Sequence, residues 1–351
     1  MAEDSSKYNP IFEAQAQGFA VGNNNIIYNY FGYREELKPA LVDADDDNLP
    51  GPYRGLYHFN PNDAEHFFGR DVFIEKIFQA TKRRNFIPVL GASGSGKSSV
   101  VLAGLVPKLQ QLGHWRFTHF RPGSDSGSNP FLALARALVP LYTKNLDATD
   151  KIIQARKLAQ SLGNGEIPLT DVFAQIHQNY PTDRVLLIAD QFEEIYTLCA
   201  DQTIRRNFLD TLLASFKSSS GTSSSTVLVA TMRADFLANA LSYRPFADML
   251  QNADIKLGAM SQEELTEVIE KPAQKLGVTF EAGLVGRIIN DVKDEPGNLP
   301  LLEFALTELW KKRTGKQLTH DAYEAIGQVK GALADYADVK YKNLTTEEKE
   351  Q

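Results

Sequence analysis

The sequence has almost no cysteine. Cys199 is the single thiol in 351 residues. One cysteine excludes an internal disulfide and a zinc site built from several thiolates. Because proteins of reducing compartments do without disulfides, this composition favours a cytoplasmic location.

Long hydrophobic runs are also missing. No apolar stretch approaches the ~20 residues that cross a bilayer. The N-terminal residues, beginning MAED, have neither the basic start nor the apolar core of a signal peptide. With 43% hydrophobic and 23% charged residues, the composition is that of an ordinary globular protein. We therefore expect no membrane partner.

The chain lacks an excess of positive charge. Lysine and arginine number 37 against 44 aspartate and glutamate residues, which gives a net charge of −7. Dedicated nucleic-acid binders usually carry a basic face, so this balance argues against nucleic acid as a partner. One short basic cluster, at residues 82–84, is the exception.

The strongest motif lies at residues 91–98, where an apolar run (86–90) leads into G-x-x-x-x-G-K-S. In this phosphate-binding loop, glycines let backbone N–H groups face phosphate oxygens, the lysine reaches the β- and γ-phosphates, and the serine hydroxyl binds Mg²⁺. A helical pattern follows, so a helix N-terminus would face the anion. A plain glycine-rich turn does not require lysine and serine at this spacing. The expected nucleotide contacts are Gly91, Ala92, Ser93, Gly94, Ser95, Gly96, Lys97, Ser98 and Ser99.

A second acidic motif, DQFEE, follows the apolar run 184–189. Asp190 ends that run, and ligands collect at the carboxyl ends of parallel strands, so we expect Asp190 and Ser98 to hold Mg²⁺ together. Glu193 is the first choice as the general base that orients water, and Glu194 is the second. The alternative is that both glutamates are solvated charges at a helix start.

Arg233 follows another apolar run, 226–231. The end of that strand should lie beside the γ-phosphate, where a guanidinium can bind phosphate oxygens with a fork of hydrogen bonds. The alternative is a surface arginine paired with Asp235.

Strand and helix patterns alternate up to about residue 258, and only helical patterns follow. This order predicts an α/β domain with a parallel sheet flanked by helices, followed by an all-helical domain. The expected strands are 86–90, 116–120, 184–190, 226–231 and 255–257. The expected C-terminal helices are 263–276, 281–293, 299–313 and 319–337.

Residues 1–50 differ from the rest of the chain. An asparagine triplet (23–25) separates two stretches rich in glycine, aromatic and apolar residues. The pattern is compatible with a short hairpin, with an arm that stacks on copies of itself, or with a mobile arm that orders on contact. Residues 43–47 carry four aspartates and precede Pro-Gly-Pro, which indicates a solvated linker.

Five ordered motifs together resemble the STAND class of P-loop signalling ATPases, which includes NACHT and NB-ARC proteins. The most similar branch is the bacterial one that is often fused to WD-repeat propellers. The resemblance runs from about residue 53 to the end. It is carried by PYRGLYHF (52–59) with FFGR (67–70), the phosphate-binding loop, DQFEE (190–194), TMRADF (231–236) and GNLPLL (297–302).

The resemblance implies further roles. Phe68, Gly69 and Arg70 would lie along the adenine and ribose, Arg233 would sense the γ-phosphate, and Pro300 would pack on the adenine from the opposite side. It also implies the start of a winged-helix domain. The expected domains are then an N-terminal arm and linker (1–50), the NTPase core (51–258), a helical domain (259–317) and a truncated winged-helix region (318–351). His320 receives no role, because no motif identifies it with the histidine that contacts ADP in related proteins.

The resemblance implies an ATP-binding, slowly hydrolysing switch, with ATP, ADP and Mg²⁺ as ligands. Its nucleotide state would control self-association and effector recruitment, with residues 18–31 as a contact for the effector. The upstream signal would bind sequence beyond Gln351. The guanine signature N-K-x-D is absent from the sequence, which favours ATP. Two alternatives stay open: an ATP-using enzyme with a second substrate, and a DNA-associated P-loop ATPase.

Overall fold

The computed structural model describes residues 49–124, 129–143, 145–216, 225–251, 253–292 and 297–342. Its centre is a five-stranded parallel sheet of β1 (Phe86–Gly91), β2 (Trp115–Phe120), β3 (Arg184–Ala189), β4 (Thr226–Arg233) and β5 (Ile255–Leu257). The spatial order is β2-β3-β4-β1-β5, so β4 separates the strand of the phosphate-binding loop from the strand that ends before Asp190. All five predicted strands are confirmed.

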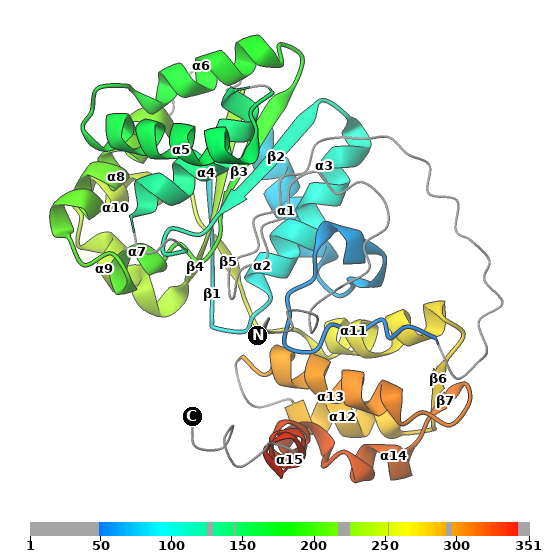
Figure 1. The fold of residues 1–351 in the computed structure, drawn as a ribbon. Coiled ribbons are helices and arrows are strands. Elements are labelled where there is room, and N and C mark those ends of the chain that lie inside the picture. The colour runs from blue at the N-terminus through cyan, green and yellow to red at the C-terminus, as the bar shows by residue number, and fades with distance from the viewer. Residues whose placement is uncertain are drawn as a thin grey trace, which may run out of the picture.

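Helices cover both faces of the sheet (Figure 1). One face carries α1 (Asp71–Thr81), α2 (Lys97–Ser99), a π-helical segment (Val100–Leu105) and α3 (Val106–Leu112). The other carries α4 (Pro130–Tyr142), α5 (Ala148–Gly163), α6 (Leu169–Asn179) and α8 (Gln202–Phe216). Short helices α7 (Glu194–Thr197), α9 (Leu237–Leu241) and α10 (Arg244–Leu250) complete this part.

The two faces are built by alternation along each strand. In β3, Leu186 and Ile188 join the core under α1 to α3, whereas Leu187 and Ala189 join the core under α4 to α8. Successive side chains of a strand point to opposite faces, so a strand covered by helices on both sides must be apolar throughout. That requirement explains why the strands were predictable as continuous apolar runs.

The helical region lies below the sheet domain in Figure 1 and has its own core. It contains α11 (Gln262–Lys275), α12 (Leu284–Val292), α13 (Leu299–Lys311), α14 (His320–Ala325) and α15 (Gln328–Lys342), with a short parallel pair formed by β6 (Thr279–Phe280) and β7 (Gln317–Leu318). Helix α11 begins with a capping box in which Ser261 accepts from the Glu264 N–H.

One prediction for this region was wrong. The segment 319–337 is two helices rather than one, because Gly327 and Gln328 adopt positive φ values of 77° and 59°. A residue in the left-handed region interrupts the helical hydrogen-bond series. The β6–β7 pair was not predicted. The N-terminal arm, including 18–31, lies outside the described residues, as does most of the serine-rich loop (described only at 215–216 and 225).

The segment before the first helix joins the two parts of the molecule. The Tyr53 hydroxyl donates to the Ile269 carbonyl oxygen of α11 at 2.6 Å. Farther along, the Phe59 N–H donates to Ser99 Oγ at 3.1 Å, next to the phosphate-binding loop. A short stretch of chain therefore contacts both the helical region and the nucleotide-binding side of the sheet. No described helix is long and apolar enough to span a bilayer.

Candidate nucleotide-binding site

The loop between β1 and α2 has the backbone shape of a phosphate cradle. Gly94 and Gly96 adopt φ values of 68° and 87°, and the helix begins at Lys97 directly after them. A Cβ on Gly91 would lie 2.9 Å from the Leu257 carbonyl oxygen, so glycine is required there by space. The loop carries its residues to the carboxyl end of the sheet, where ligands of parallel sheets bind.

Lys97 folds back over this loop. Its ammonium donates to the carbonyl oxygens of Gly91 (3.1 Å) and Ala92 (2.7 Å), and the residue is only 8% exposed. Burial lowers the pKa of Lys97, and the carboxylates of Glu193 and Asp190 oppose that shift. The Lys97 ammonium therefore lies at the loop that would hold a phosphate. A phosphate oxygen would be a stronger hydrogen-bond acceptor for this ammonium than either carbonyl oxygen.

Asp190 lies at the centre of the polar network. Its Oδ1 accepts hydrogen bonds from Ser98 Oγ (2.7 Å) and Thr231 Oγ1 (2.5 Å), and its Oδ2 is 3.8 Å from His119 Nε2. Burial alone raises the pKa of this carboxyl, but His119, Thr231 and Ser98 together hold the pKa of Asp190 well below its ordinary value. The predicted approach of Asp190 to Ser98 is therefore present in the structure.

These two residues fit a magnesium ion. A serine hydroxyl and an ionised carboxylate are the oxygen ligands that Mg²⁺ prefers, with phosphate oxygens and water filling the other positions. Among the described residues, no group of three or more His, Cys, Asp or Glu side chains is arranged to hold a metal without such help. The donor set matches a metal that arrives with a nucleotide.

The two glutamates of the acidic motif have different surroundings. Glu193 lines the cavity described below, and its Oε2 accepts from the Arg233 N–H at 3.2 Å. Burial raises the pKa of Glu193. Glu194 instead faces the β2 side, where Arg121 and the Gly123 N–H bind its carboxylate. Glu193 therefore faces the cavity, whereas Glu194 lies outside its lining.

Arg233 extends from the end of β4. Its guanidinium donates to both carboxylate oxygens of Asp235, at 3.1 and 2.6 Å, and the side chain is 42% exposed. The same residue lines the cavity. The pairing with Asp235 is therefore present in the structure, and the arginine also borders the pocket.

A cavity of about 390 Å³ opens above the loop, between the sheet and the helical region. Its volume falls in the range of small-ligand pockets. Predicted site residues that line it are Phe68, Arg70, Ser93, Gly94, Gly96, Lys97, Ser98, Ser99, Glu193, Arg233 and Pro300. Predicted residues that lie outside its lining are Gly69, Gly91, Ala92, Ser95, Asp190 and Glu194.

The Arg70 side chain supports the loop itself. Its Nη2 donates to the Ser95 carbonyl oxygen at 3.0 Å, and its Nη1 lies 3.8 Å from Glu264 of α11. The guanidinium is buried, and burial lowers its pKa. Arg70 thus connects the phosphate-binding loop to the helical region, a role that the sequence did not indicate.

Three polar residues of the site were not predicted: Thr231, His119 and Glu303. Thr231 belongs to the TMRADF motif but was given no role beyond the end of a strand, and His119 belonged to no motif. Glu303 follows the GNLPLL motif directly, yet a glutamate in a helix usually faces solvent. Its position three residues after Pro300 places both on one helix face, which was the available signal.

Comparisons with known proteins agree with this geometry. The family described as Novel STAND NTPase 1 matches residues 52–351. No curated protein matches the sequence.

Two solved structures are similar to this chain. The ORC1 protein of Aeropyrum pernix, solved in complex with DNA, has a TM-score of 0.50 at 14% identity, over 82% of this chain and 71% of that chain. The Walker-type ATPase PABY2304 of Pyrococcus abyssi has a TM-score of 0.48 at 11% identity, over 85% and 77% of the two chains. The family match covers the sheet, the phosphate-binding loop and the helical region, and the chain belongs to the novel STAND NTPase 1 family (nSTAND1) of nucleotide-binding P-loop NTPases.

Proposed function

We propose that this protein is a switch that binds ATP with Mg²⁺, hydrolyses it slowly, and changes its association with other molecules according to the nucleotide bound. The observation that carries the proposal is the composition of the cavity wall. Loop residues such as Lys97 and helical-region residues such as Pro300 line the same cavity. A ligand that fills it contacts both parts of the molecule at once.

Close packing between the two parts supports this coupling. A Cβ on Gly69 would meet the Glu264 carbonyl oxygen of α11 at 2.7 Å, and a Cβ on Gly297 would meet the Ser93 carbonyl oxygen of the loop at 2.7 Å. Interfaces packed this tightly shift between discrete arrangements rather than deform continuously. A ligand shifts such an equilibrium only through different affinities for the two arrangements.

Each polar side chain of the site would have a separate role in binding or hydrolysis. Lys97 would exchange its loop carbonyls for β- and γ-phosphate oxygens. Ser98 and Asp190 would hold Mg²⁺, which neutralises charge on the phosphates when bound. Glu193 would orient the attacking water, and Arg233 would contact the γ-phosphate. Because catalysis of this kind rests on positioning and electrostatics, hydrolysis is expected to be slow unless a partner supplies a further cation.

Self-association and effector recruitment are the proposed outputs, with residues 18–31 as the contact for an effector. The motivation is their low charge and high content of asparagine and aromatic residues. A deletion of 18–31 should leave nucleotide binding intact and abolish recruitment of the effector. Unchanged recruitment would remove this part of the proposal.

The experiment that tests the switch combines two measurements. Mass spectrometry of the purified protein identifies the bound nucleotide, and size-exclusion chromatography with ATP and with ADP reports association. Adenine nucleotide in the wild type, its loss in Lys97→Ala, and different elution with ATP and ADP are expected. Identical elution with both nucleotides would contradict a switch, and absence of binding would contradict the site itself.

A further inference from the structure

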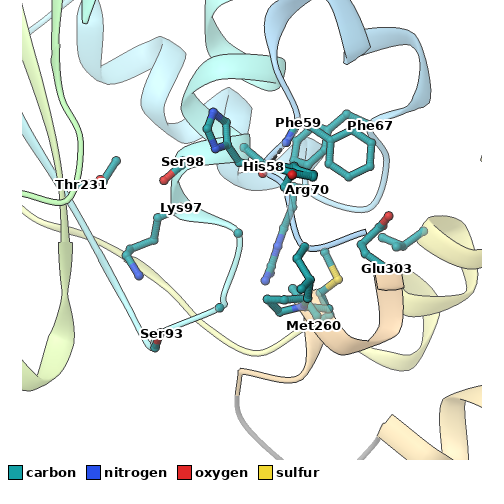
Figure 2. A pocket seen from close by; sticks show the side chains of 18 of the residues that line it. His58, Phe59, Phe67, Arg70, Ser93, Lys97, Ser98, Thr231, Met260 and Glu303 are labelled. Carbon is teal, nitrogen blue, oxygen red and sulfur yellow. Dashed lines mark hydrogen bonds between the residues drawn. The ribbon is translucent and has the colours of Figure 1, made fainter. Parts of the chain in front are cut away.

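The cavity has a second polar group at the end opposite the phosphate-binding loop. Figure 2 shows Lys97 and Ser98 on one side of the pocket and Met260 and Glu303 on the other, with Arg70 between them. If phosphates occupy the loop end, the remote end receives the base. Glu303 is the acidic side chain at that remote end of the lining.

The surroundings of Glu303 are largely apolar. The residue is 9% exposed and shares the cavity wall with Phe68, Met260, Val268, Leu299 and Pro300. Within the described residues, one hydrogen bond reaches its carboxyl group: the Arg54 N–H donates to Oε2 at 3.2 Å. Apolar walls suit the faces of a flat base, and a carboxyl group with free hydrogen-bonding capacity suits its polar edge.

We propose that the Glu303 carboxyl group selects adenine over 6-oxopurines by pairing with N1 and the 6-amino group of the base. The inference rests on the proposed nucleotide site and deepens it, because it assigns the base that the site accepts. Neither the phosphate-binding loop nor Asp190 can make this distinction, since both contact only groups that all nucleoside triphosphates share.

The protonation state and the Arg54 N–H together set the direction of the pairing, because the N–H donates to Oε2 and so makes Oε2 the acceptor and Oε1 the oxygen that carries the proton. Burial raises the pKa of Glu303 to about 8, so the group is largely neutral at neutral pH. A neutral carboxyl group has one O–H donor and one carbonyl acceptor. Its O–H can donate to adenine N1, while its carbonyl oxygen accepts from the 6-amino group and from the Arg54 N–H. Hypoxanthine and guanine present the opposite pattern, an N1–H donor beside a 6-oxo acceptor.

The test compares ATP with inosine triphosphate, which differs from ATP only at the N1 and 6 positions of the base. Calorimetry should give wild type an ATP preference of about 10- to 100-fold, the cost of leaving buried polar groups unpaired. Glu303→Leu should reduce the preference to about 1. Glu303→Gln should keep it, because a side-chain amide has the same donor and acceptor pair as a neutral carboxyl. Glu308→Gln on the same helix is the matched control.

A pH series on wild type and Glu303→Gln tests the same idea. Above about pH 8 the carboxylate is an acceptor only, so the ATP affinity of wild type should fall by about 10-fold relative to that of Glu303→Gln. This series uses ATP alone, because the N1–H of hypoxanthine ionises at alkaline pH whereas adenine does not, and triphosphate ionisation cancels because both proteins bind the same nucleotide.

The outcomes separate two failures. Equal affinities of wild type for the two triphosphates, or a preference that Glu303→Leu retains, would overturn base selection and leave the nucleotide site in place. If neither triphosphate binds, the site itself is refuted, and base selection with it. Glu303→Leu protein that does not fold leaves the pH series and Glu303→Gln to decide.

Discussion

Gly297, in the turn before α13, lies against the backbone of Ser93 in the phosphate-binding loop so closely that a Cβ would come within 2.7 Å of the Ser93 carbonyl oxygen. Real Cβ atoms do not approach an oxygen that closely, and Gly297 also has a φ of 97°. The contact joins two segments that are about two hundred residues apart in sequence. Through this contact a shift of the phosphate-binding loop would move the helical region, and a shift of the helical region would move the loop.

Gly297→Ala should separate these two segments. Gly283→Ala is the matched control, because Gly283 has a φ of 84° and nothing within 4 Å of an added Cβ. Both variants incur the strain of alanine at positive φ, on the order of 1 kcal/mol, but only Gly297→Ala adds a collision. Release of ADP, measured by stopped-flow fluorescence, should accelerate in Gly297→Ala alone. Equal rates in the two variants would show that the contact does not retain nucleotide.

Asp190→Asn should remove the dependence of ATP binding on magnesium. The carboxylate that accepts from Ser98 and Thr231 is ionised, and an amide is a far weaker ligand for Mg²⁺. Calorimetry should show about a 10-fold or greater loss of ATP affinity with Mg²⁺ and little change with chelator. A variant whose affinity still rises with Mg²⁺ as in wild type would remove Asp190 from the metal site.

Glu193→Gln should impair hydrolysis, whereas Glu194→Gln should impair stability. The Glu193 side chain faces the cavity, so its amide variant should keep ATP binding and lose about 100-fold in hydrolysis. Glu194 is held by Arg121 and the Gly123 N–H, so its variant should lower the free energy of unfolding by about 1–3 kcal/mol and leave hydrolysis by folded protein near wild type. Phosphate release and thermal unfolding measure the two effects. If Glu194→Gln loses hydrolysis and Glu193→Gln does not, Glu194 is the base.

Much of this site was readable from local patterns. The phosphate-binding loop is a continuous segment whose glycines and lysine act within a few residues of one another, so spacing alone identified it. Asp190 was found because a buried parallel strand is apolar up to the residue that meets ligand. Each of these predictions depends on the sequence of a single segment. The STAND resemblance added the predicted positions of Phe68 and Pro300 in the pocket.

The remainder depends on contacts between distant segments. Glu303 looks like any solvated helical glutamate until α13 packs against the segment that contains Arg54, 249 residues earlier. Thr231 is an acceptable strand residue in any sheet, and only the adjacency of β3 and β4 brings its hydroxyl to Asp190. The break at Gly327 was missed because apolar periodicity continues across it, although glycine in a helical pattern is a recognised stop signal.

Glu303 also predicts how stability depends on pH. Its pKa is about 8 in the folded protein against 4.5 for an ordinary glutamate. Between these values the folded state binds one more proton than the unfolded state, so the free energy of unfolding falls as pH rises. The slope from this group is at most about 1.4 kcal/mol per pH unit. Glu303→Gln has no proton to lose and should flatten the curve, whereas Glu308→Gln should not. Chemical denaturation from pH 5 to pH 8 measures the slopes, and parallel curves for wild type and Glu303→Gln would show that Glu303 is ionised in the folded protein.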